Sequence, residues 1–406
     1  RIQVLIHLFE TDSDLFSFQG STGDETPKGV SLILSIRGGL HMGGRTAFVL
    51  RRICIAIPLI WLIATVAFVI IQLAPGDPTT MMISPDMTKE QVERMMREAE
   101  MQEDVWTRYK NWLSDLTRGS WGTSFMTKRP VFQEFAERWP ASMELALGSF
   151  LFTLVLAIPA GLIGAAKQYT PTDNIITFAA FFGISMPNFW LALLLIMLFA
   201  FHLPNLLYFI FDQTLGWFSI PESFTVLPIA GRIGLEYTVV RRTGFYLIDT
   251  LLMRDFRAFG SALAHLILPV FVSGTAGMAG LTRYVRGGIL ENMNAEYVRT
   301  ARAAGVPERT VLYKYVFRNG LIPLVTILGP SITILISGSV IVETIFAWPG
   351  LGRFFTDATF SRDYPVIMMS LVMGTTLSIV GNLIADLLYG VVDPRVSVGK
   401  GYGGRG

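Results

Sequence analysis

The stretch AEYVRTARAAGVPERTVLYKYVFRNG, residues 295–320, is cationic, rich in alanine and interrupted by Gly305-Val306-Pro307. Strongly apolar sequence precedes it and follows it. Residues 295–304 are mostly good helix formers, Gly305 suits a helix end, and Pro307 suits the first turn of a second helix. The stretch therefore predicts two short helices that meet at an angle between two membrane-like segments.

The composition of the whole chain is that of a membrane protein. Of the 406 residues, 51% are hydrophobic and 16% are charged, whereas a soluble protein has roughly a quarter charged residues. The net charge of +2 does not indicate a nucleic-acid partner. Cys54 is the single cysteine, so no intrachain disulfide can form, and four histidines with one cysteine leave little material for a metal site.

Six apolar stretches are long enough to cross a bilayer as helices, which requires about 20 residues each. None contains Asp, Glu, Lys or Arg, and one contains a histidine, His265. The run 203–211 is too short to span and is expected at the membrane interface. Prolines predict kinks at positions 58, 159, 187, 269 and 330. The predicted spans are 53–74, 145–166, roughly 175–201, 262–282, 321–342 and 364–385.

Cationic residues predict the orientation of these spans. They precede the first span and follow the second, fourth and sixth, and all lie on one side if every span crosses once. We expect that side to be cytoplasmic, with both ends of the chain there and the loops 75–144, 202–261 and 343–363 outside. The cationic residues are Arg45, Arg51, Arg52, Lys167, Arg283, Arg286, Arg299, Arg302, Arg309, Lys314, Arg318, Arg395 and Lys400.

The two ends of the chain differ from its centre. Residues 1–41 do not resemble the rest of the chain, and Met42 begins a short basic lead into the first span. We therefore treat 1–41 as an N-terminal extension of unknown status and 42–395 as the transmembrane domain. The glycine-rich residues 396–406 are expected to be a disordered tail.

The first outer loop is expected to contain a helix over 88–118. Thr88 and Gln91 have the spacing of a capping box, apolar residues from Val105 to Leu116 recur at helical spacing, and Gly119 ends the pattern. This helix either packs on the membrane domain or provides a docking surface for an extracytoplasmic partner. The second outer loop, 202–261, is interpreted as a lid with turn signals at its prolines and glycines.

Motifs for catalysis and nucleotide binding are absent from the sequence. The patterns G-x-x-x-x-G-K-[ST], H-E-x-x-H and G-x-S-x-G do not occur. No predicted span carries a carboxylate pair or a mid-membrane cation, which would mark ion coupling. Glu144, Glu343 and Asp386 lie at span ends and are expected to be solvated, and His265 to be satisfied by backbone or water. We therefore expect a chain with no enzymatic activity, catalytic residue, metal or cofactor.

Small residues recur in two of the spans. Gly274, Gly277 and Gly280 follow one another at intervals of three, and Ser337-Gly338-Ser339 forms a second group. Such residues allow helices to approach closely in lipid. The alternative is a helix face that slides beside a transport pathway.

Residues 295–320 lie between two spans and suit a rigid segment on which a soluble cytoplasmic protein exerts force. Thr300, Ala301 and Ala304 are small enough to enter a groove, whereas Arg299 and Arg302 are expected to meet its acidic rims. We expect Ala301 to face the groove, with Ala303 facing away. The alternative is a basic loop that binds anionic lipid headgroups.

This segment resembles the EAA loop of ABC importer permeases, in the form found in the dipeptide, oligopeptide and nickel group. The match is close in YVRTARAAGV and YVFRNGLIP. The resemblance covers about residues 42–395, with a B-type Arg-Arg before the first span and a large first outer loop. Other matching stretches are LAPGDP at 73–78, GSWGTS at 119–124, PASMELAL at 140–147, SMPNFW at 185–190, HLILPV at 265–270, FAWPGLG at 346–352, RDYPV at 362–366 and NLIADLLYGVVDPR at 382–395.

The resemblance implies an all-α membrane subunit with the type I importer fold, in the cell membrane of a prokaryote. Its implied partners are a second homologous permease, two ATPase subunits that bind ATP and Mg, a solute-binding protein and membrane lipid, and no nucleic acid. Coupling to the ATPases is implied for the loop 286–320, with contacts at Tyr297, Arg299, Thr300, Ala301, Ala304, Gly305 and Pro307.

The sequence departs from the general EAA pattern in the loop itself. Arg299-Thr300-Ala301 stands where that pattern has Glu-Ala-Ala, and Arg318 stands where other groups have proline. Contacts of the missing glutamate therefore do not carry over. The solute stays open among dipeptides, oligopeptides, opines, glycosides and nickel chelates. A secondary transporter and a membrane enzyme are the rival interpretations, and the missing midplane charges and catalytic motifs count against them.

Overall fold

The computed structural model describes residues 45–73, 88, 90, 104–208, 226–321, 324 and 339–392. The chain divides into two compact units, residues 1–51 with 402–406 and residues 52–401, and nearly all of the described residues belong to the second. In the described part, regular secondary structure is helical apart from one isolated antiparallel bridge between Thr123 and Pro130. The predicted all-α fold is confirmed for these residues.

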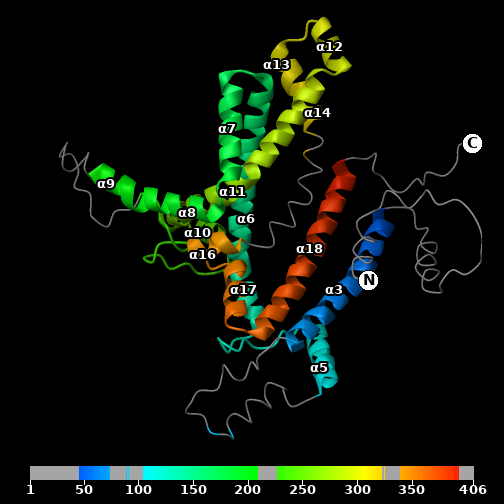
Figure 1. Ribbon diagram of the computed structural model, residues 1–406, viewed down its shortest axis with the longest axis vertical. Coiled ribbons are helices and arrows are strands. Elements are labelled where there is room, and N and C mark those ends of the chain that lie inside the picture. The colour runs from blue at the N-terminus through cyan, green and yellow to red at the C-terminus, as the bar shows by residue number, and fades with distance from the viewer. Residues whose placement is uncertain are drawn as a thin grey trace, which may run out of the picture. The chain divides into compact units, whose positions relative to one another are not determined.

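Five helical runs in the described residues are long and apolar enough to cross a membrane (Figure 1). Four of them contain or overlap the first, second, fourth and sixth predicted spans. The predicted fifth span, 321–342, lies almost wholly outside the described residues. The five runs belong to α3 (Arg45–Leu73), α6 (Val131–Ala166), the residues 188–208, α11 (Phe256–Met293) and α18 (Tyr364–Val392).

The helices α6 and α11 are much longer than the apolar stretches that predicted them. They contain 36 and 38 residues, which correspond to roughly 54 and 57 Å of helix. The hydrocarbon core of a bilayer is only about 30 Å thick. Each helix therefore extends beyond the core, and its polar turns continue where hydropathy alone predicted loops.

The third predicted span, roughly 175–201, is divided at Pro187, where a kink was predicted, and the run long enough to cross a membrane is shifted to residues 188–208. Helix α7 (Pro171–Ser185) ends at Met186, whose backbone is extended, and α8 (Asn188–Ile196) begins after Pro187. The ring of Pro187 disfavours helical backbone at Met186 and removes one backbone donor. Prolines 58, 159 and 269 lie inside continuous helices instead.

Beyond this break, the helix is longer than expected. The π-helical segment η2 (Met197–His202) and α9 (Leu203–Tyr208) continue α8 directly. Residues 203–208, predicted as part of a separate interfacial run, therefore belong to the run 188–208.

The remaining helices are short and connect or cap the long ones. They are α5 (Val105–Thr117), α10 (Tyr246–Leu252), α12 (Glu296–Ala303), α13 (Glu308–Thr310), the π-helical η4 (Val311–Phe317), α14 (Arg318–Gly320), α16 (Val340–Ile345) and α17 (Leu351–Phe360).

Helix α5 covers the second half of the helix predicted over 88–118, and the prediction of one continuous helix was wrong because the backbone of Asp104 is not helical (φ −55°, ψ 140°). Asp104 caps its first turn by accepting from the backbone N–H of Trp106, and Gly119, at φ +79°, ends it as predicted. Residues 91–103 lie outside the described part. Tyr109 of α5 packs with Phe68 of α3 and Met368 of α18, which supports the interpretation of this helix as one that packs on the membrane domain.

Helix α6 is the common element of the core, and its main partner is α11. Gly274 of α11 lies so close to α6 that a Cβ there would stand 3.0 Å from the carbonyl oxygen of Ser149. The hydroxyl of Thr153 donates to the Gly274 carbonyl at 2.9 Å. Gly274 thus has the close-packing role predicted for small residues, whereas Gly280 has open space where its Cβ would be.

Candidate functional site

The segment 295–320, called the coupling segment below, begins with α12 and turns sharply at Gly305. Gly305 adopts φ +76°, a left-handed conformation that favours glycine. Its N–H donates to the carbonyl of Arg302, and the N–H of Val306 donates to the carbonyl of Ala301. This pair of bonds is the Schellman arrangement that closes a helix C-terminus. The predicted helix end at Gly305 is confirmed.

The second helical piece starts immediately after the turn. Pro307 is its N-cap residue rather than a member of its first turn, and its carbonyl accepts from the N–H groups of Thr310 and Val311. From Glu308 to Gly320 the chain is continuously helical through α13, η4 and α14. The two-helix prediction is therefore confirmed, with the break at residues 305–307.

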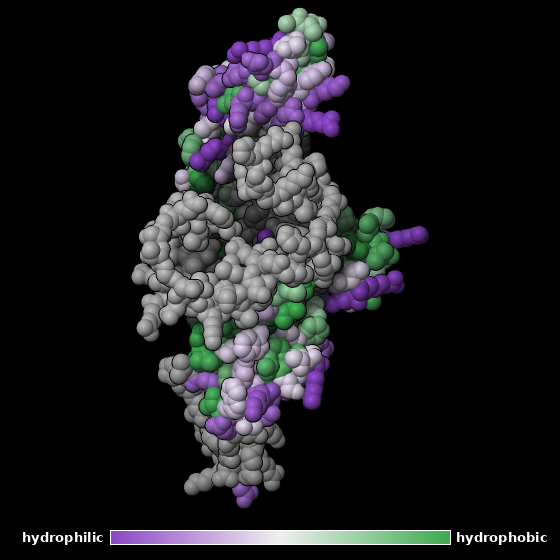
Figure 2. Space-filling view, turned by 90° about the vertical axis from the view of Figure 1, so that its right-hand side faces the viewer, coloured by the Kyte–Doolittle hydropathy of each residue, from purple (hydrophilic) through white to green (hydrophobic). Residues whose placement is uncertain are grey.

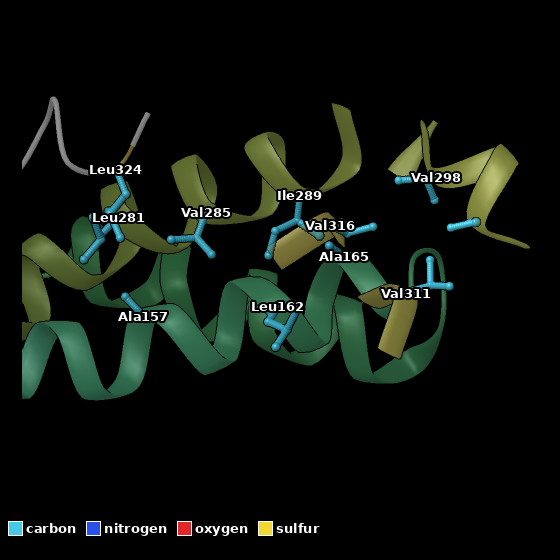
Figure 3. Packing of buried hydrophobic residues seen from close by; sticks show 11 residues of the cluster. Ala157, Leu162, Ala165, Leu281, Val285, Ile289, Val298, Val311, Val316 and Leu324 are labelled. Atoms are coloured by element: carbon cyan, nitrogen blue, oxygen red, sulfur yellow. The ribbon is translucent and has the colours of Figure 1, made fainter. Parts of the chain in front are cut away.

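One side of the coupling segment is apolar and buried. Val298, Val311 and Val316 are fully buried, and they pack in one cluster with Ala165 of α6 and Ile289 of α11 (Figure 3). The cluster continues along α6 and α11 toward Ala157 and Leu281. The segment is therefore seated on the two longest helices of the unit by apolar contacts.

Ala301 lies on this buried side, contrary to the prediction that it faces outward. It is only 8% exposed and belongs to the same apolar cluster, whereas Ala303 is exposed. The helical repeat gives the reason, because Ala301 follows the buried Val298 by three residues and so shares its face. In the structure Ala303, and not Ala301, is therefore the exposed alanine of this helix.

The other predicted contact residues lie on the exposed side. Tyr297 is partly exposed, and its hydroxyl donates to the Asn292 side chain at 2.6 Å. Arg299, Thr300, Ala304, Gly305 and Pro307 are exposed. The end of the unit that carries α12 and α13 shows mainly hydrophilic side chains in Figure 2.

Arg302 is committed to a partner within the segment. Its Nη2 donates to Glu308 Oε1 at 2.7 Å and its Nε to Oε2 at 3.2 Å, so the pair bridges the turn between α12 and α13. Hydrogen bonding to Arg302 lowers the pKa of the Glu308 carboxyl, and the same bond raises the pKa of Arg302. The sequence predicts that Arg302 meets an acidic rim elsewhere; in the structure it braces the turn.

The part of α11 that leads into the segment is tied to α7 by an ion pair that sequence reasoning missed. Arg286 of α11 makes two hydrogen bonds, of 2.8 and 3.0 Å, to the carboxylate of Asp173 near the start of α7. This bonding lowers the pKa of Asp173. The two residues are 113 positions apart, and their only sequence signal is that each lies near the end of a predicted span.

A second polar group, called the carboxylate cluster below, comprises Ser142, Glu144, Arg232 and Glu343. Glu144 and Glu343 are buried rather than solvated, so the prediction for them was wrong. Glu343 accepts from the Ser142 hydroxyl at 2.7 Å and from the Arg353 N–H at 3.0 Å. Burial raises the pKa of Glu343 despite these hydrogen bonds.

Glu144 completes the cluster through a buried ion pair. Arg232 Nη2 donates to Glu144 Oε2 at 2.6 Å, and the Leu247 N–H donates to its Oε1 at 3.0 Å. The Arg232 guanidinium also lies over the Tyr246 ring, 3.9 Å from its centre. The cluster therefore joins α6 to the chain around Arg232, to α10 and to α16.

The other candidate groups have ordinary structural environments. His265 is buried, and its Nδ1 lies 2.7 Å from the Ser261 carbonyl, so the predicted backbone partner is confirmed. Cys54 is exposed. Within the residues that the structure describes, no three His, Cys, Asp or Glu side chains are grouped as metal ligands. The side chain of Asp386 is outside the described residues.

Comparison with known protein families matches most of the chain to one class of transport proteins. The family model of the "binding-protein-dependent transport system inner membrane component" matches residues 157–398, and the model of the N-terminal part of such membrane components matches 45–146.

Curated permeases match over nearly their whole length. The oligopeptide transport system permease protein AppB of Bacillus subtilis is 40% identical over 351 residues, which cover 86% of this chain and 99% of the relative. The di/tripeptide permease DppB of Pseudomonas aeruginosa is 36% identical over 355 residues, and the dipeptide permease DppB of Escherichia coli K12 is 33% identical over 353 residues. These two alignments cover 86% of this chain and 98% of each relative.

Proposed function

We propose, from the premise that this chain belongs to the family of binding-protein-dependent transport system inner membrane components, that it is the permease subunit of an ATP-driven peptide importer. The chain is a multi-pass inner-membrane transport component, not a catalytic one. Its coupling segment passes the motion of separate ATPase subunits to the spanning helices. Tyr297, Arg299, Thr300, Ala304, Gly305 and Pro307 form the contact surface, while Ala301 supports it from inside.

The observation that carries this proposal is the two-sided construction of the coupling segment. Its exposed side offers small and cationic residues to a soluble partner, and its other side is packed on α6 and α11 through fully buried valines. A close-packed interior transmits displacement rather than absorbing it. A loop that merely binds lipid headgroups needs no such foundation, so the packing favours the coupling role.

The substrate class is proposed from the relatives. Their names describe transport of oligopeptides, dipeptides and tripeptides, and we extend peptides as a class to this chain. The choice among peptides, or of an opine, glycoside or nickel chelate instead, is assigned to the solute-binding protein. ATP and Mg are assigned to the two ATPase subunits, and no cofactor to this chain.

The proposed assembly has this chain beside a second homologous permease, with the solute-binding protein outside. The topology is six spans within residues 42–395, both ends being cytoplasmic, and 321–342 supplies the span after the coupling segment. The carboxylate cluster then lies at the outer end of α6, opposite the ATPases. Alternating access follows when ATP-driven closure of the ATPases displaces the coupling segment.

Ala303→Glu tests the coupling role on the exposed side. A carboxylate there must be desolvated when an ATPase subunit packs against α12, so ATPase retention on the purified complex and peptide uptake are expected to fall together, by roughly tenfold or more. The matched control is Ala136→Glu, an exposed alanine in the first turns of α6. Its retention and uptake are expected to stay near wild type.

Gly305→Leu provides an independent test, because it acts on the turn rather than on the surface. Leucine is strained at φ +76°, so the angle between α12 and α13 should change while the membrane helices remain folded. Full uptake and normal ATPase retention in both Ala303→Glu and Gly305→Leu would reduce the segment to a lipid-facing basic loop.

A further inference from the structure

Helix α10 is built with its polar side inward and its apolar side outward. Asp249 and Thr250 are fully buried, whereas Ile248, Leu251 and Leu252 are 48%, 53% and 55% exposed. The three exposed residues are spaced at i, i+3 and i+4, so they share one face of the helix. A helix that borders water has the opposite arrangement. The pattern indicates that an apolar medium covers this face.

The inward side of α10 is fully satisfied, which fixes the orientation of the helix. The Asp249 carboxylate accepts from the N–H groups of Thr243 and Gly244 at 2.8 and 3.0 Å, and Thr250 donates to the Tyr246 carbonyl at 2.6 Å. The N–H of Leu247 donates to Glu144 of α6. These bonds prevent α10 from rotating to bury its leucines, so the outward orientation of the apolar face is fixed by the fold.

The apolar surface continues along the chain into the spanning helix α11. Phe256, its first residue, is 71% exposed. Leu263, Ile267 and Phe271 are also exposed, and their spacing places them on the same face as Phe256. Because α11 is about 57 Å long and the hydrocarbon core about 30 Å thick, the first turns of α11 lie near the boundary of the bilayer. Helix α10 packs beside those turns.

Exposed cations border this apolar face. Arg254 and Arg257 lie on either side of Phe256 along the chain, and Arg241 and Arg242 precede α10. The acidic residues between them are engaged with the backbone, because Asp249 holds the turn before α10 and Asp255 caps α11 by accepting from the N–H groups of residues 257 and 258. An apolar face edged by arginines is the pattern of a helix that lies in a membrane interface.

We propose that α10 lies in the headgroup boundary of the leaflet at the start of α11 and binds anionic phospholipid there. Ile248, Leu251, Leu252 and Phe256 contact the upper acyl chains. Arg254 and Arg257 contact lipid phosphates, each contributing roughly a fivefold preference for anionic over neutral lipid. The continuity with the exposed face of α11 favours lipid over a protein partner, because one medium then covers both helices.

The test measures which medium surrounds Leu252 in the complete transporter. The full chain with Cys54→Ser and Leu252→Cys is assembled with its partner subunits, labelled with a nitroxide, and placed in vesicles of phosphatidylethanolamine and phosphatidylglycerol. Collision rates with oxygen, which concentrates in lipid, and with a water-soluble nickel chelate are compared. Leu263→Cys is the reference for lipid, and the exposed Glu236→Cys is the reference for water.

A label at 252 is expected to behave like the label at 263, with oxygen collisions dominating. Low collision rates with both reagents would mean that protein, such as a second permease, covers α10. Dominant collisions with nickel would mean that the face is open to water and available to a soluble partner. Either result overturns the lipid proposal.

A second measurement tests the proposed contact between the two arginines and anionic lipid. Replacing phosphatidylglycerol with phosphatidylcholine is expected to raise nickel access at 252, because the choline group cancels the phosphate charge and the arginines lose their net anionic partner. In the Arg254→Gln/Arg257→Gln variant this lipid change should have no effect. A lipid response of the wild-type size in that variant would overturn the assignment of these two arginines.

Discussion

The carboxylate cluster contacts the first half of α6 and the coupling segment packs near its C-terminal end, and the two regions are held by opposite kinds of interaction. Glu343 and Glu144 are buried and accept hydrogen bonds from Ser142, Arg353, Arg232 and Leu247. The coupling segment is held instead by buried valines, with one exposed ion pair across its turn. Directional bonds to a buried carboxylate fail together when the acceptor is lost, whereas apolar packing weakens in proportion to the atoms removed.

This difference agrees with what each region joins and with the role proposed for the coupling segment. The carboxylate cluster joins several chain segments in one geometry, so its contacts specify a single arrangement. In the role proposed for it, the coupling segment binds a soluble partner on one side and moves with it, and a base of close-packed apolar side chains moves as a unit. The two regions are therefore expected to respond differently to substitution, from a large loss in the cluster to a small one at the exposed ion pair.

Removing the acceptor at the centre of the carboxylate cluster should have the largest effect. Glu343→Ala leaves the Ser142 hydroxyl and the Arg353 N–H without their buried acceptor, and it is expected to lower the free energy of unfolding by roughly 2–5 kcal/mol. Thermal unfolding of the detergent-solubilised complex measures this. Glu343→Gln keeps one acceptor oxygen and should be intermediate.

The control for this change is the neighbouring exposed Thr344→Ala, which should differ little from wild type. If Glu343→Ala proves no more harmful than Thr344→Ala, the cluster does not hold the fold and the contrast between the two regions is lost.

Trimming the apolar seat of the coupling segment should have a smaller, graded effect. Val311 is fully buried, and Val311→Ala removes two buried methyl groups, with an expected loss of roughly 1–3 kcal/mol in unfolding free energy. Retention of the ATPase subunits should fall only in part, because the exposed contact residues remain. Thr310→Ala, at the adjacent exposed position, serves as the control. An all-or-none loss of folding in Val311→Ala would contradict the graded behaviour expected of this region.

Breaking the exposed brace of the coupling segment should have the smallest effect. Arg302→Gln removes the partner of Glu308, and because the pair is exposed the expected loss is only a few tenths of a kcal/mol. The pair lowers the pKa of Glu308 below its ordinary value of 4.5. Its stabilisation is therefore present above that value and is lost as pH falls through the lowered pKa.

The measurement is the melting temperature as a function of pH. The wild type should lose its small advantage over Arg302→Gln in acid, and the two curves should run parallel at neutral pH. A wild-type advantage that grows as pH falls would have the wrong sign for this pair.

Local sequence was a good guide wherever a feature depends on the residue itself and its near neighbours. Gly305 and Gly119 end helices because they adopt left-handed backbone that other residues adopt with strain. Long apolar runs predicted α3, α6, α11 and α18 because the bilayer sets the length of a span. The boundaries were less exact, since a helix continues through polar residues once other helices support it.

The coupling segment shows how far site prediction reached. Its break lies at the predicted place, and the residues at positions 297, 299, 300, 304, 305 and 307 are exposed. Their contact with ATPase subunits stays a prediction. The inward position of Ala301 and the pairing of Arg302 with Glu308 do not agree with the sequence analysis. Composition marks Ala301 and Ala303 as equally small, and only the position of Val298 against α6 and α11 decides which of them is buried.

The sequence alone therefore determined that this is a helical membrane protein and where most of its spans lie. It also determined which polar segment between the spans forms two short helices. These properties derive from hydropathy, helix propensity and the backbone freedom of single residues. Tertiary structure alone decided that Glu343 and Glu144 are buried, that Arg286 meets Asp173, and that α10 turns its leucines outward. The environment of each of these side chains is set by partners that are distant in the sequence, and no local pattern of residues specifies which partners will meet.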